Sequence, residues 1–237
     1  MKDSISVIIP AYNEEHSLKD AVIVAINVLS DICKEYEIII VNDGSTDATG
    51  KIATLLAKKN RKIKVIHHKD NEGFGKTFND GLAIASKKYV TGFPADNDIF
   101  TETFRNLLLA RKSDRIVSSY MITMSRREII RQIISYSFST MMNLIFGLKL
   151  KYYNGYFICP LHMVKTLKLA SSGFTIFAEI KIRLINKGVK IDEIPFEYKP
   201  RPHGVSKALA LKNILQTLSF IPVLIADVYV PRSSSNP

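Results

Sequence analysis

The sequence predicts an α/β fold with a mostly parallel, Rossmann-like sheet flanked by helices, and two observations lead to this prediction. The first half of the 237-residue chain alternates short β-branched runs with segments of helical periodicity, an order typical of βαβ units. These runs are almost wholly apolar, which indicates parallel strands covered on both faces. The length suits one α/β domain with at most a short extension.

Each expected element follows from its own run of residues. The first strand is the β-branched run at 4–9, which ends at Pro10, and similar runs predict further strands at 36–41, 62–66 and 88–93. Apolar residues at helical spacing predict the intervening helices, over about 14–33, 47–59 and 75–87.

The second half predicts amphipathic C-terminal helices. Residues 126–146 carry apolar side chains at threes and fours, with three arginines at the start, Arg126, Arg127 and Arg131. Residues 208–230 are mostly apolar, but Pro222 and several polar residues interrupt them too often for a bilayer-spanning helix. An interfacial membrane helix and a helix that covers the sheet both stay open. We expect one domain over 1–207 and a helical extension with a short tail over 208–237.

The charge balance requires an anionic partner. The formal net charge of +11 favours nucleic acid, a phosphate-bearing substrate or an anionic membrane face. No nucleic-acid-binding motif accompanies the basic residues, so we expect no nucleic acid. Cys33 and Cys159 are far apart and lack metal-ligand spacing, which predicts two reduced, buried thiols. Because Met1 leads directly into the first strand without a signal peptide, the predicted location is the cytoplasm.

Polar clusters follow three of the predicted strands, at 12–15, 42–47 and 96–98. Ligands of parallel sheets gather where strands end, so these clusters are candidate site residues. In Asp96-Asn97-Asp98, two nearby carboxylates repel unless a cation lies between them. Such hard oxygen ligands suit Mg²⁺ or Mn²⁺, which could bridge a diphosphate leaving group.

Two further clusters have both a structural and a functional interpretation. In the segment after the second strand, Ser45 or Thr46 is expected to cap the next helix, while Asp43 contacts a base or ribose. Gly73 and Gly75 are expected to allow a tight turn into a helix whose N-terminus, with Lys76, faces a phosphate. This segment lacks the first glycine of a phosphate-binding P-loop, and the first strand is not followed by the glycines of a dinucleotide fingerprint.

Three later features are weaker as isolated signals. Arg201, Ser206 and Lys207 surround a glycine turn, which indicates either a phosphate clamp or a basic surface loop. Glu179 lies among apolar residues of a predicted helix, so it belongs to a solvated face or to the wall of an active site. His67 and His68 have no metal-ligand partner at helical spacing and are interpreted as surface or strand-end residues.

Taken together, these motifs resemble the family-2 inverting glycosyltransferases, which have the GT-A fold. The resemblance is carried by segments 7–15, 41–47, 71–73, 96–98, 193–195 and 201–207. The later segments are similar to the branch of dolichyl- and polyprenyl-phosphate sugar synthases. The resemblance implies that Pro10, Tyr12 and Glu14 line the nucleotide pocket, and that Asp43 contacts the nucleoside. Asp96 and Asp98 would hold Mg²⁺ or Mn²⁺ and the donor, and Arg201, Ser206 and Lys207 would face a donor or acceptor phosphate.

The implied reaction is a single displacement at the anomeric carbon, from a nucleotide sugar to a lipid phosphate at the inner face of the cell membrane. A phosphate acceptor needs no strong base, whereas a hydroxyl acceptor would need Asp98 or Glu179. Phe100, Tyr120 and Tyr156 replace polar or basic residues common in mannose synthases, which weighs against mannose specifically. A nucleotidyltransferase and a non-catalytic, basic membrane-binding module are the alternatives.

Overall fold

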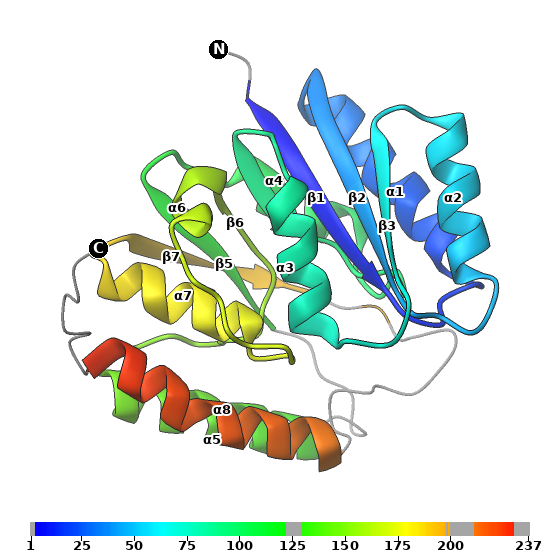
Figure 1. Cartoon of the computed structure of the whole chain (residues 1–237). Helices are drawn as coiled ribbons and strands as arrows, with labels where there is room; N and C mark the ends of the chain where they lie inside the picture. Colours follow the sequence, from blue (N-terminus) through cyan, green and yellow to red (C-terminus); the bar gives the residue numbers. More distant parts are fainter. Residues whose placement is uncertain (1–2, 122–128, 198, 200–210, 230–237) are drawn as a thin grey trace, which may run out of the picture.

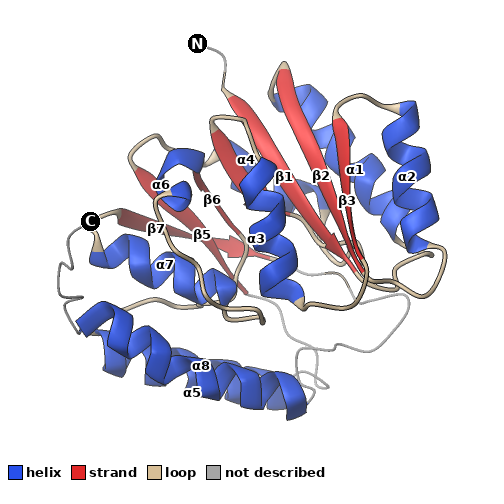
Figure 2. Cartoon of the chain, viewed as in Figure 1, coloured by secondary structure: helices blue, strands red, loops and turns tan. Residues whose placement is uncertain are grey.

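The chain folds around one seven-stranded sheet with strand order β3-β2-β1-β4-β6-β5-β7 (Figures 1 and 2). The computed structural model describes residues 3–121, 129–197, 199 and 211–229. Helices cover both faces of the sheet, as the apolar strand runs require. The predicted α/β class with a mostly parallel sheet is therefore confirmed.

The first half forms the parallel part of the sheet. Its strands are β1 (Ser4–Ala11), β2 (Glu35–Asp43), β3 (Ile63–His68) and β4 (Tyr89–Gly92), and each neighbouring pair among them is parallel. The connecting helices are α1 (Leu18–Ile32), α2 (Thr49–Lys59) and α3 (Phe74–Ile84). Helix α1 begins at Leu18 instead of residue 14, because the preceding residues form a loop that bonds to the residues after β2.

The second half adds three strands that the sequence analysis did not identify. They are β5 (Arg115–Met121), β6 (Phe157–Pro160) and β7 (Lys190–Phe196), and β6 runs antiparallel between β4 and β5. Strands β5 and β7 pair in parallel at the edge. The helices beside them are α4 (Thr101–Leu109), α6 (Leu161–Lys165) and α7 (Ile176–Asn186).

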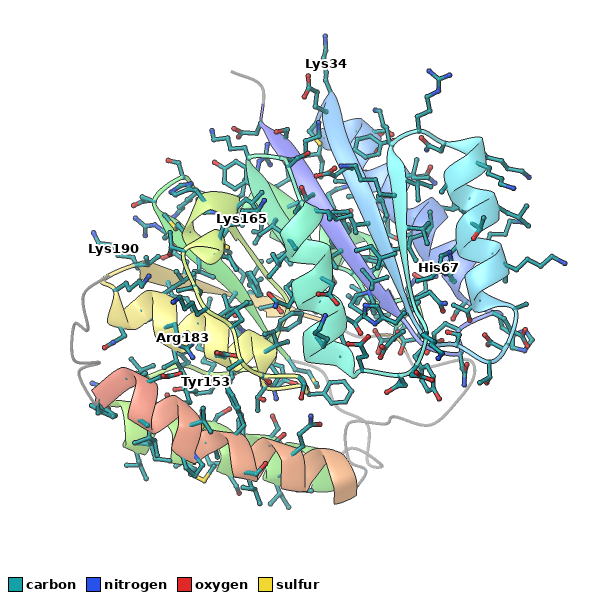
Figure 3. All side chains as sticks on the ribbon, in the orientation of Figure 1. Lys34, His67, Tyr153, Lys165, Arg183 and Lys190 are labelled. Carbon is teal, nitrogen blue, oxygen red and sulfur yellow. The ribbon has the colours of Figure 1, made fainter. Side chains whose placement is uncertain are left out.

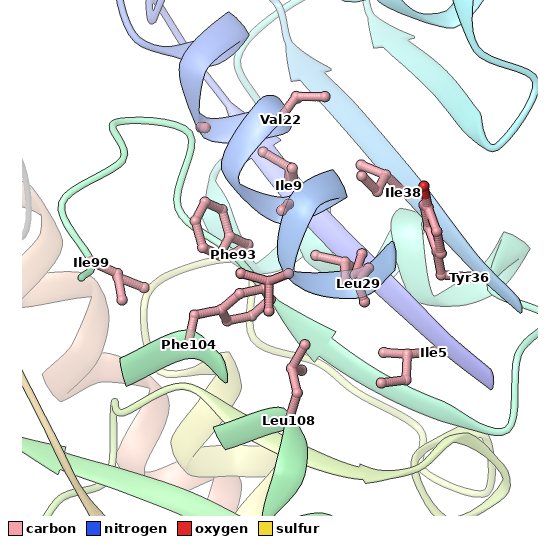
Figure 4. Close-up of a cluster of buried hydrophobic side chains, with 14 of the residues drawn as sticks. Ile5, Ile9, Val22, Leu29, Tyr36, Ile38, Phe93, Ile99, Phe104 and Leu108 are labelled. Atoms are coloured by element: carbon pink, nitrogen blue, oxygen red, sulfur yellow. The ribbon is translucent and has the colours of Figure 1, made fainter. Parts of the chain in front are cut away.

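Two apolar cores lie on opposite faces of the sheet, because successive strand residues point to opposite sides. Ile5 and Ile9 of β1 pack with α1 and α4 on one face, where Phe93 and Phe104 meet edge to face at 4.5 Å (Figure 4). Ile8 packs on the other face with side chains of α3, α6 and α7. Cys33 and Cys159 are buried free thiols, as predicted.

Helices α5 (Ile129–Phe146) and α8 (Leu211–Tyr229) form a further layer beyond α7 (Figure 1). A third cluster joins them to α7 through Met142, Tyr153, Ile182 and Leu224. The hydroxyl of Tyr229 also donates to the carbonyl of Ile145 at 2.7 Å. Helix α8 thus packs on other helices, not on the sheet itself. Among the described residues, no helix is long and apolar enough to cross a membrane.

Candidate active site

The carboxyl ends of β1, β2 and β4 bring the three predicted polar clusters to one edge of the sheet. Strand β1 lies between β2 and β4, so the loop after β1 is central. Pro10 occupies the second-to-last position of β1, opposite Val41 of β2. Tyr12 and Glu14 follow in the loop and are both partly buried.

Hydrogen bonds join the loop after β1 to the loop after β2. The backbone N–H of Asn13 donates to Ser45 Oγ at 3.0 Å, and the N–H of Thr46 donates to Asn13 Oδ1 at 2.9 Å. Asn13 adopts a left-handed φ of 55°, which asparagine tolerates better than most residues. The N–H of Glu14 donates to Thr49 Oγ1 at 2.7 Å. These bonds fix the shape of the central loop before any ligand arrives.

The expected cap of α2 by Ser45 or Thr46 is wrong. Ala48 is the N-cap residue, and Ser45 is instead bonded to Asn13. Asp47 provides part of the expected capping, because its Oδ1 accepts a hydrogen bond from the N–H of Thr49, the first residue of α2, at 2.9 Å. Burial alone would raise the pKa of the Asp47 carboxyl, but the hydrogen bonds from Thr49 hold it below its usual value.

Asp43 is buried and organises the turn that begins α3. Its Oδ1 accepts the N–H of Glu72 at 2.8 Å, and its Oδ2 accepts the N–H of Gly73 at 3.0 Å. His68 Nδ1 also donates to Asp43 Oδ1 at 2.9 Å. His68 was interpreted as a surface or strand-end residue; it does end β3, but its side chain is only 6% exposed. The register of β2 with β3 pairs Asp43 with His68. This contact could have been predicted from the sequence only if the register of the two strands had been known.

Gly73 and Gly75 allow a second backbone to approach this turn closely. Gly73 has a φ of 95°, and a Cβ on it would lie 2.7 Å from the carbonyl oxygen of Ser172. The N–H of Gly75 donates to that same oxygen at 2.8 Å. The tight turn into α3 is present, as the two glycines predicted. Lys76 contacts Asp80 and lies 3.7 Å from Glu72, so its expected role at a phosphate gains no support from these contacts.

Glu179 is fully buried, so its interpretation as a solvated residue is wrong. Its carboxylate accepts the N–H groups of Ala170 and Ser171, at 3.0 and 2.9 Å, and the Nε–H of Arg183 at 2.8 Å. A carboxylate held by these donors is not placed to take a proton from a substrate. Glu179 fixes the segment that backs Gly73 and Gly75, and these contacts give no support to its predicted role as a catalytic base.

Helix α8 reaches the same segment by two contacts. Arg183 bridges Glu179 and Asp227 of α8, with 2.5 Å between its Nη2 and Asp227 Oδ2. Gln216 of α8 donates to Ser172 Oγ at 2.8 Å. Figure 3 shows Arg183 and Tyr153 in the space between α7 and the α5–α8 layer. The outer helices are thus connected to the turn that Asp43 holds.

Asp96, Asn97 and Asp98 form a compact turn after β4. Asn97 has a left-handed φ of 53°, and the N–H of Asp98 lies 3.4 Å from Asp96 Oδ1. The left-handed residue reverses the chain, so the two carboxylates do not alternate across a strand. Asn97 Oδ1 is buried and accepts no hydrogen bond from the described residues. Two carboxylates and an amide oxygen on one turn fit a hard divalent cation.

The chain returns to this turn at Lys199, whose N–H donates to the Asp98 carbonyl at 2.6 Å. Its ammonium lies 5.8 Å from the centre of the Phe100 ring. Lys199 precedes the predicted phosphate clamp by two residues. Arg201, Ser206 and Lys207 themselves lie outside the described residues, as do Arg126 and Arg127.

Lys181 is a buried residue that the sequence analysis missed. Its Nζ donates to the carbonyls of Tyr153 and Gly155, each at 2.8 Å. Burial lowers the pKa of Lys181 to about 7, against the opposing influence of Glu193. The sequence around Lys181 does not indicate that its ammonium is buried and bonded to backbone carbonyls, because these carbonyls belong to a loop distant in sequence. That loop leads to Tyr156, whose ring lies 3.2 Å from a Cβ built on Gly92, at the end of β4.

An open, mostly parallel sheet with polar loops at the carboxyl ends of its strands is the architecture of nucleotide-binding α/β proteins. The model of the family described as "Glycosyl transferase family 2" matches residues 6–164, so the chain belongs to this family. The family resemblance inferred from the motifs is thereby confirmed.

Curated relatives are similar over different parts of their lengths. A dolichol-phosphate mannosyltransferase of Pyrococcus furiosus is 30% identical over 92% of this chain and 62% of that protein. An undecaprenyl-phosphate mannosyltransferase of Micrococcus luteus is 26% identical, with 86% of each chain covered. The match to the glycosyltransferase GlyG of Streptococcus pneumoniae spans only 40% of that protein, at 28% identity. The chain thus spans well under two thirds of several relatives.

Solved structures confirm the GT-A fold. The glucosyl-3-phosphoglycerate synthase of Mycobacterium tuberculosis, in complex with Mn²⁺, UDP-glucose and phosphoglyceric acid, superposes with a TM-score of 0.68. The match covers 98% of this chain and 81% of that one, at 18% sequence identity. At 18% identity this similarity establishes the fold alone. The Mn²⁺, UDP-glucose and phosphoglyceric acid are ligands of the mycobacterial enzyme.

Proposed function

We propose that the chain is a metal-dependent inverting glycosyltransferase that moves a sugar from a nucleotide sugar to a polyprenyl phosphate. The observation that carries the proposal is that β1, β2 and β4 are neighbouring parallel strands, so the loops after β1 and β2 and the Asp96-Asn97-Asp98 turn all follow carboxyl ends on the same side of the sheet. Membership of glycosyl transferase family 2 supports the reaction class. Two relatives, a dolichol-phosphate and an undecaprenyl-phosphate mannosyltransferase, support a lipid-phosphate acceptor.

The donor nucleotide would bind over the ends of β1 and β2. Pro10, Tyr12 and Glu14 would line its pocket, on a loop that hydrogen bonds already hold in shape. Asp43 would act at the nucleoside, directly or through the Glu72–Gly73 turn that its carboxylate fixes. Such a preformed pocket reduces the ordering cost of binding.

Asp96 and Asp98 would hold Mg²⁺ or Mn²⁺, with the amide oxygen of Asn97 as a third donor of the same hard type. A divalent cation there would neutralise the charge that develops on the leaving diphosphate. Asp98 is only 7% exposed, and its backbone carbonyl is anchored by Lys199. The chain therefore limits the freedom of the turn that carries these carboxylates.

The acceptor side would use basic groups from the segment that follows Lys199. A phosphate acceptor is anionic at neutral pH, so the displacement needs positive charge to bring two anions together but no strong base. Arg201, Ser206 and Lys207 are our candidates for binding the donor diphosphate or the acceptor phosphate. If the acceptor is a hydroxyl, Asp98 is the remaining carboxylate that could take its proton.

We further infer that α5 and α8 rest on a membrane surface, the location of a polyprenyl phosphate. Helix α5 exposes Ile133, Tyr136 and Leu144 to 61, 75 and 81%, and α8 exposes Leu218 to 48%. The three α5 residues lie at spacings of three and eight, along one side of the helix. Apolar stripes on a strongly basic chain suit an anionic membrane face. A cytoplasmic enzyme at the inner face of the cell membrane would fit this placement.

Radiolabelled transfer tests the proposal. The full chain would be incubated with a panel of nucleotide sugars and membrane lipid extract, with Mn²⁺, Mg²⁺ or a chelator. We expect at least one nucleotide sugar to transfer label to the lipid phase, and mild acid to release that label. The chelator and the Asp98→Ala substitution should each abolish the transfer. A lipid product stable to mild acid would indicate a hydroxyl acceptor. No transfer from any donor, or full activity of the folded Asp98→Ala protein, would overturn the assignment.

A further inference from the structure

A second group of potential metal ligands lies at the end of β3 and the start of α3. It consists of His68, Glu72 and Asp80, whose ligand atoms all lie within 4.8 Å of one another. None of these residues belongs to the Asp96–Asp98 turn. They come from a strand end, a turn and the second turn of a helix, so three elements would be joined by one cation.

The imidazole of His68 is held with one nitrogen directed at this group. Its Nδ1 bonds to Asp43 Oδ1 at 2.9 Å, and because a carboxylate only accepts, Nδ1 must carry the proton. This is the carboxylate–histidine arrangement that orients metal-binding imidazoles. Nε2 is then directed toward Asp80. It is buried and makes no aligned hydrogen bond to any described residue.

The spacing between the neighbouring atoms agrees with a shared cation. His68 Nε2 lies 3.0 Å from Asp80 Oδ2. Two adjacent ligands at about 2.1 Å from one octahedral metal ion lie about 3 Å apart. Glu72 is 45% exposed and lies on a turn, so its carboxylate has room to complete the set.

Positive charge is already drawn to this position. The ammonium of Lys76 contacts Asp80 Oδ2 and lies 3.7 Å from Glu72 Oε2, and these carboxylates raise the pKa of Lys76. With Asp43 beside them, three carboxylates face one lysine and one histidine. Lys76 is 44% exposed, so its side chain can swing into water and leave the carboxylates to another cation.

We propose that His68, Glu72 and Asp80 form a second divalent-cation site, separate from Asp96–Asp98, and that the Lys76 ammonium competes with the cation for it. One imidazole and two carboxylates favour a transition-metal cation such as Zn²⁺ or Mn²⁺ over Ca²⁺, which takes oxygen ligands. A bound cation would join the end of β3 to α3 beside the turn that Asp43 holds. This inference does not depend on the proposed transfer reaction.

Cation binding to the full-length double variant Asp96→Asn/Asp98→Asn tests the site in isolation. Zn²⁺ and Mn²⁺ would be titrated separately by calorimetry without nucleotide, and the unfolding temperature would be followed in parallel. We expect one remaining site for at least one of the two cations. In that background, Glu72→Gln and Asp80→Asn should each weaken it at least tenfold, and Lys76→Met should tighten it. Glu102→Gln, which alters an exposed carboxylate on α4, is the matched control.

Glu72 is exposed, so its substitution should leave the fold intact and keep the test decisive. If the double variant binds neither cation, or binds equally well after Glu72→Gln and Asp80→Asn, the proposal is wrong. His68 then serves only to join Asp43 and Asp80, with Lys76 as the permanent counter-charge. If the double variant does not fold, the wild-type chain should bind two cations and the Glu72→Gln chain one; a single site in both would overturn the proposal.

Discussion

At the scale of single residues, similar carboxylates near the sheet edge have different tasks. Asp43 and Glu179 accept backbone N–H groups and hold turns, while Asp96 and Asp98 share a turn with a left-handed asparagine. Sequence spacing located all four carboxylates and suggested roles for them, but it could not show which of them hold backbone turns. The partners of a carboxylate come from distant segments, as with Ala170 and Ser171 at Glu179.

Replacing Glu179 by glutamine tests its positioning role. One backbone N–H bond or the Arg183 bond must be lost, because an amide NH₂ cannot accept. We expect a lower unfolding temperature, by a free energy of about 1–3 kcal/mol, and a higher KM for the donor with a smaller change in kcat. Asp227→Asn weakens the contact between Arg183 and α8 without changing Glu179, and should leave the donor KM unchanged. A kcat loss alone, with KM intact, would favour a catalytic role instead.

The buried ammonium of Lys181 should make stability depend on pH. Its pKa is lowered from 10.5 to about 7 in the folded chain. Between these values the unfolded state binds more protons, so this group's contribution to stability rises as pH increases from 7 towards 10. Chemical unfolding at pH 7, 8 and 9 should show a steeper rise for wild type than for Lys181→Met. Parallel curves would contradict the burial of a titrating lysine here.

At the scale of elements, the contact between the Gly73–Gly75 turn and segment 170–173 determines the donor side of the site. A Cβ on Gly75 would collide with Ser171 and lie 2.7 Å from the Gly173 carbonyl oxygen. These neighbours are backbone atoms, so the two segments would have to separate. The glycines were predicted to permit a tight turn; the approaching segment could not be foreseen, because it lies about a hundred residues further along the chain.

Gly75→Ala should therefore lower the unfolding temperature and weaken nucleotide-sugar binding severalfold. Gly173→Ala is a matched control in the same contact, because the atoms nearest to its Cβ would belong to the end of the Gln216 side chain, 2.8 Å away. That side chain can rotate, so we expect a small effect. Thermal unfolding and donor titration would be measured on both. Equal losses in the two variants would argue against a specific backbone contact.

The elements also show where sequence patterns stop being informative. Strands β1, β2 and β4 were predicted from β-branched, mostly apolar runs, and nearly all of their residues are buried. The edge strand β3 was predicted from its β-branched residues, although it is only partly buried. Strand β6 is buried and apolar, but its four residues end at Pro160 and run directly into α6, and β7 mixes charged and apolar residues at the sheet edge. Helix α5 was predicted from its periodicity, although the strands before and after it in the chain, β5 and β6, were not.

At the scale of the whole molecule, α5 and α8 form an outer layer that packs on α7. None of the described helices meets the length and hydropathy that a membrane-spanning helix needs. The sequence left open whether α8 lies on a membrane or covers the sheet. In the structure, one side of α8 packs on α7 and α5, and other residues of α8 remain exposed. A sequence window cannot separate these outcomes, because a helix that packs on other helices and an interfacial helix share the same periodicity.

Leu144→Glu should weaken binding to anionic liposomes without lowering stability, because this side chain is 81% exposed on α5. The added negative charge would remove apolar contact and repel the lipid surface. Liposome cosedimentation with and without anionic lipid is the measurement. Leu55→Glu changes a side chain that is 47% exposed on α2, and should not affect binding. Similar losses for both would show that net charge alone drives association.

The central claim is that Asp96 and Asp98 hold a divalent cation and, through it, a nucleotide sugar. Its most direct test is the unfolding temperature of the full chain with nucleotide sugars, measured with Mn²⁺, with Mg²⁺ and with chelator. The account predicts stabilisation by at least one nucleotide sugar that requires the cation and disappears in Asp96→Asn/Asp98→Asn. Stabilisation that persists in the folded double variant, or that is unaffected by chelator, would contradict it.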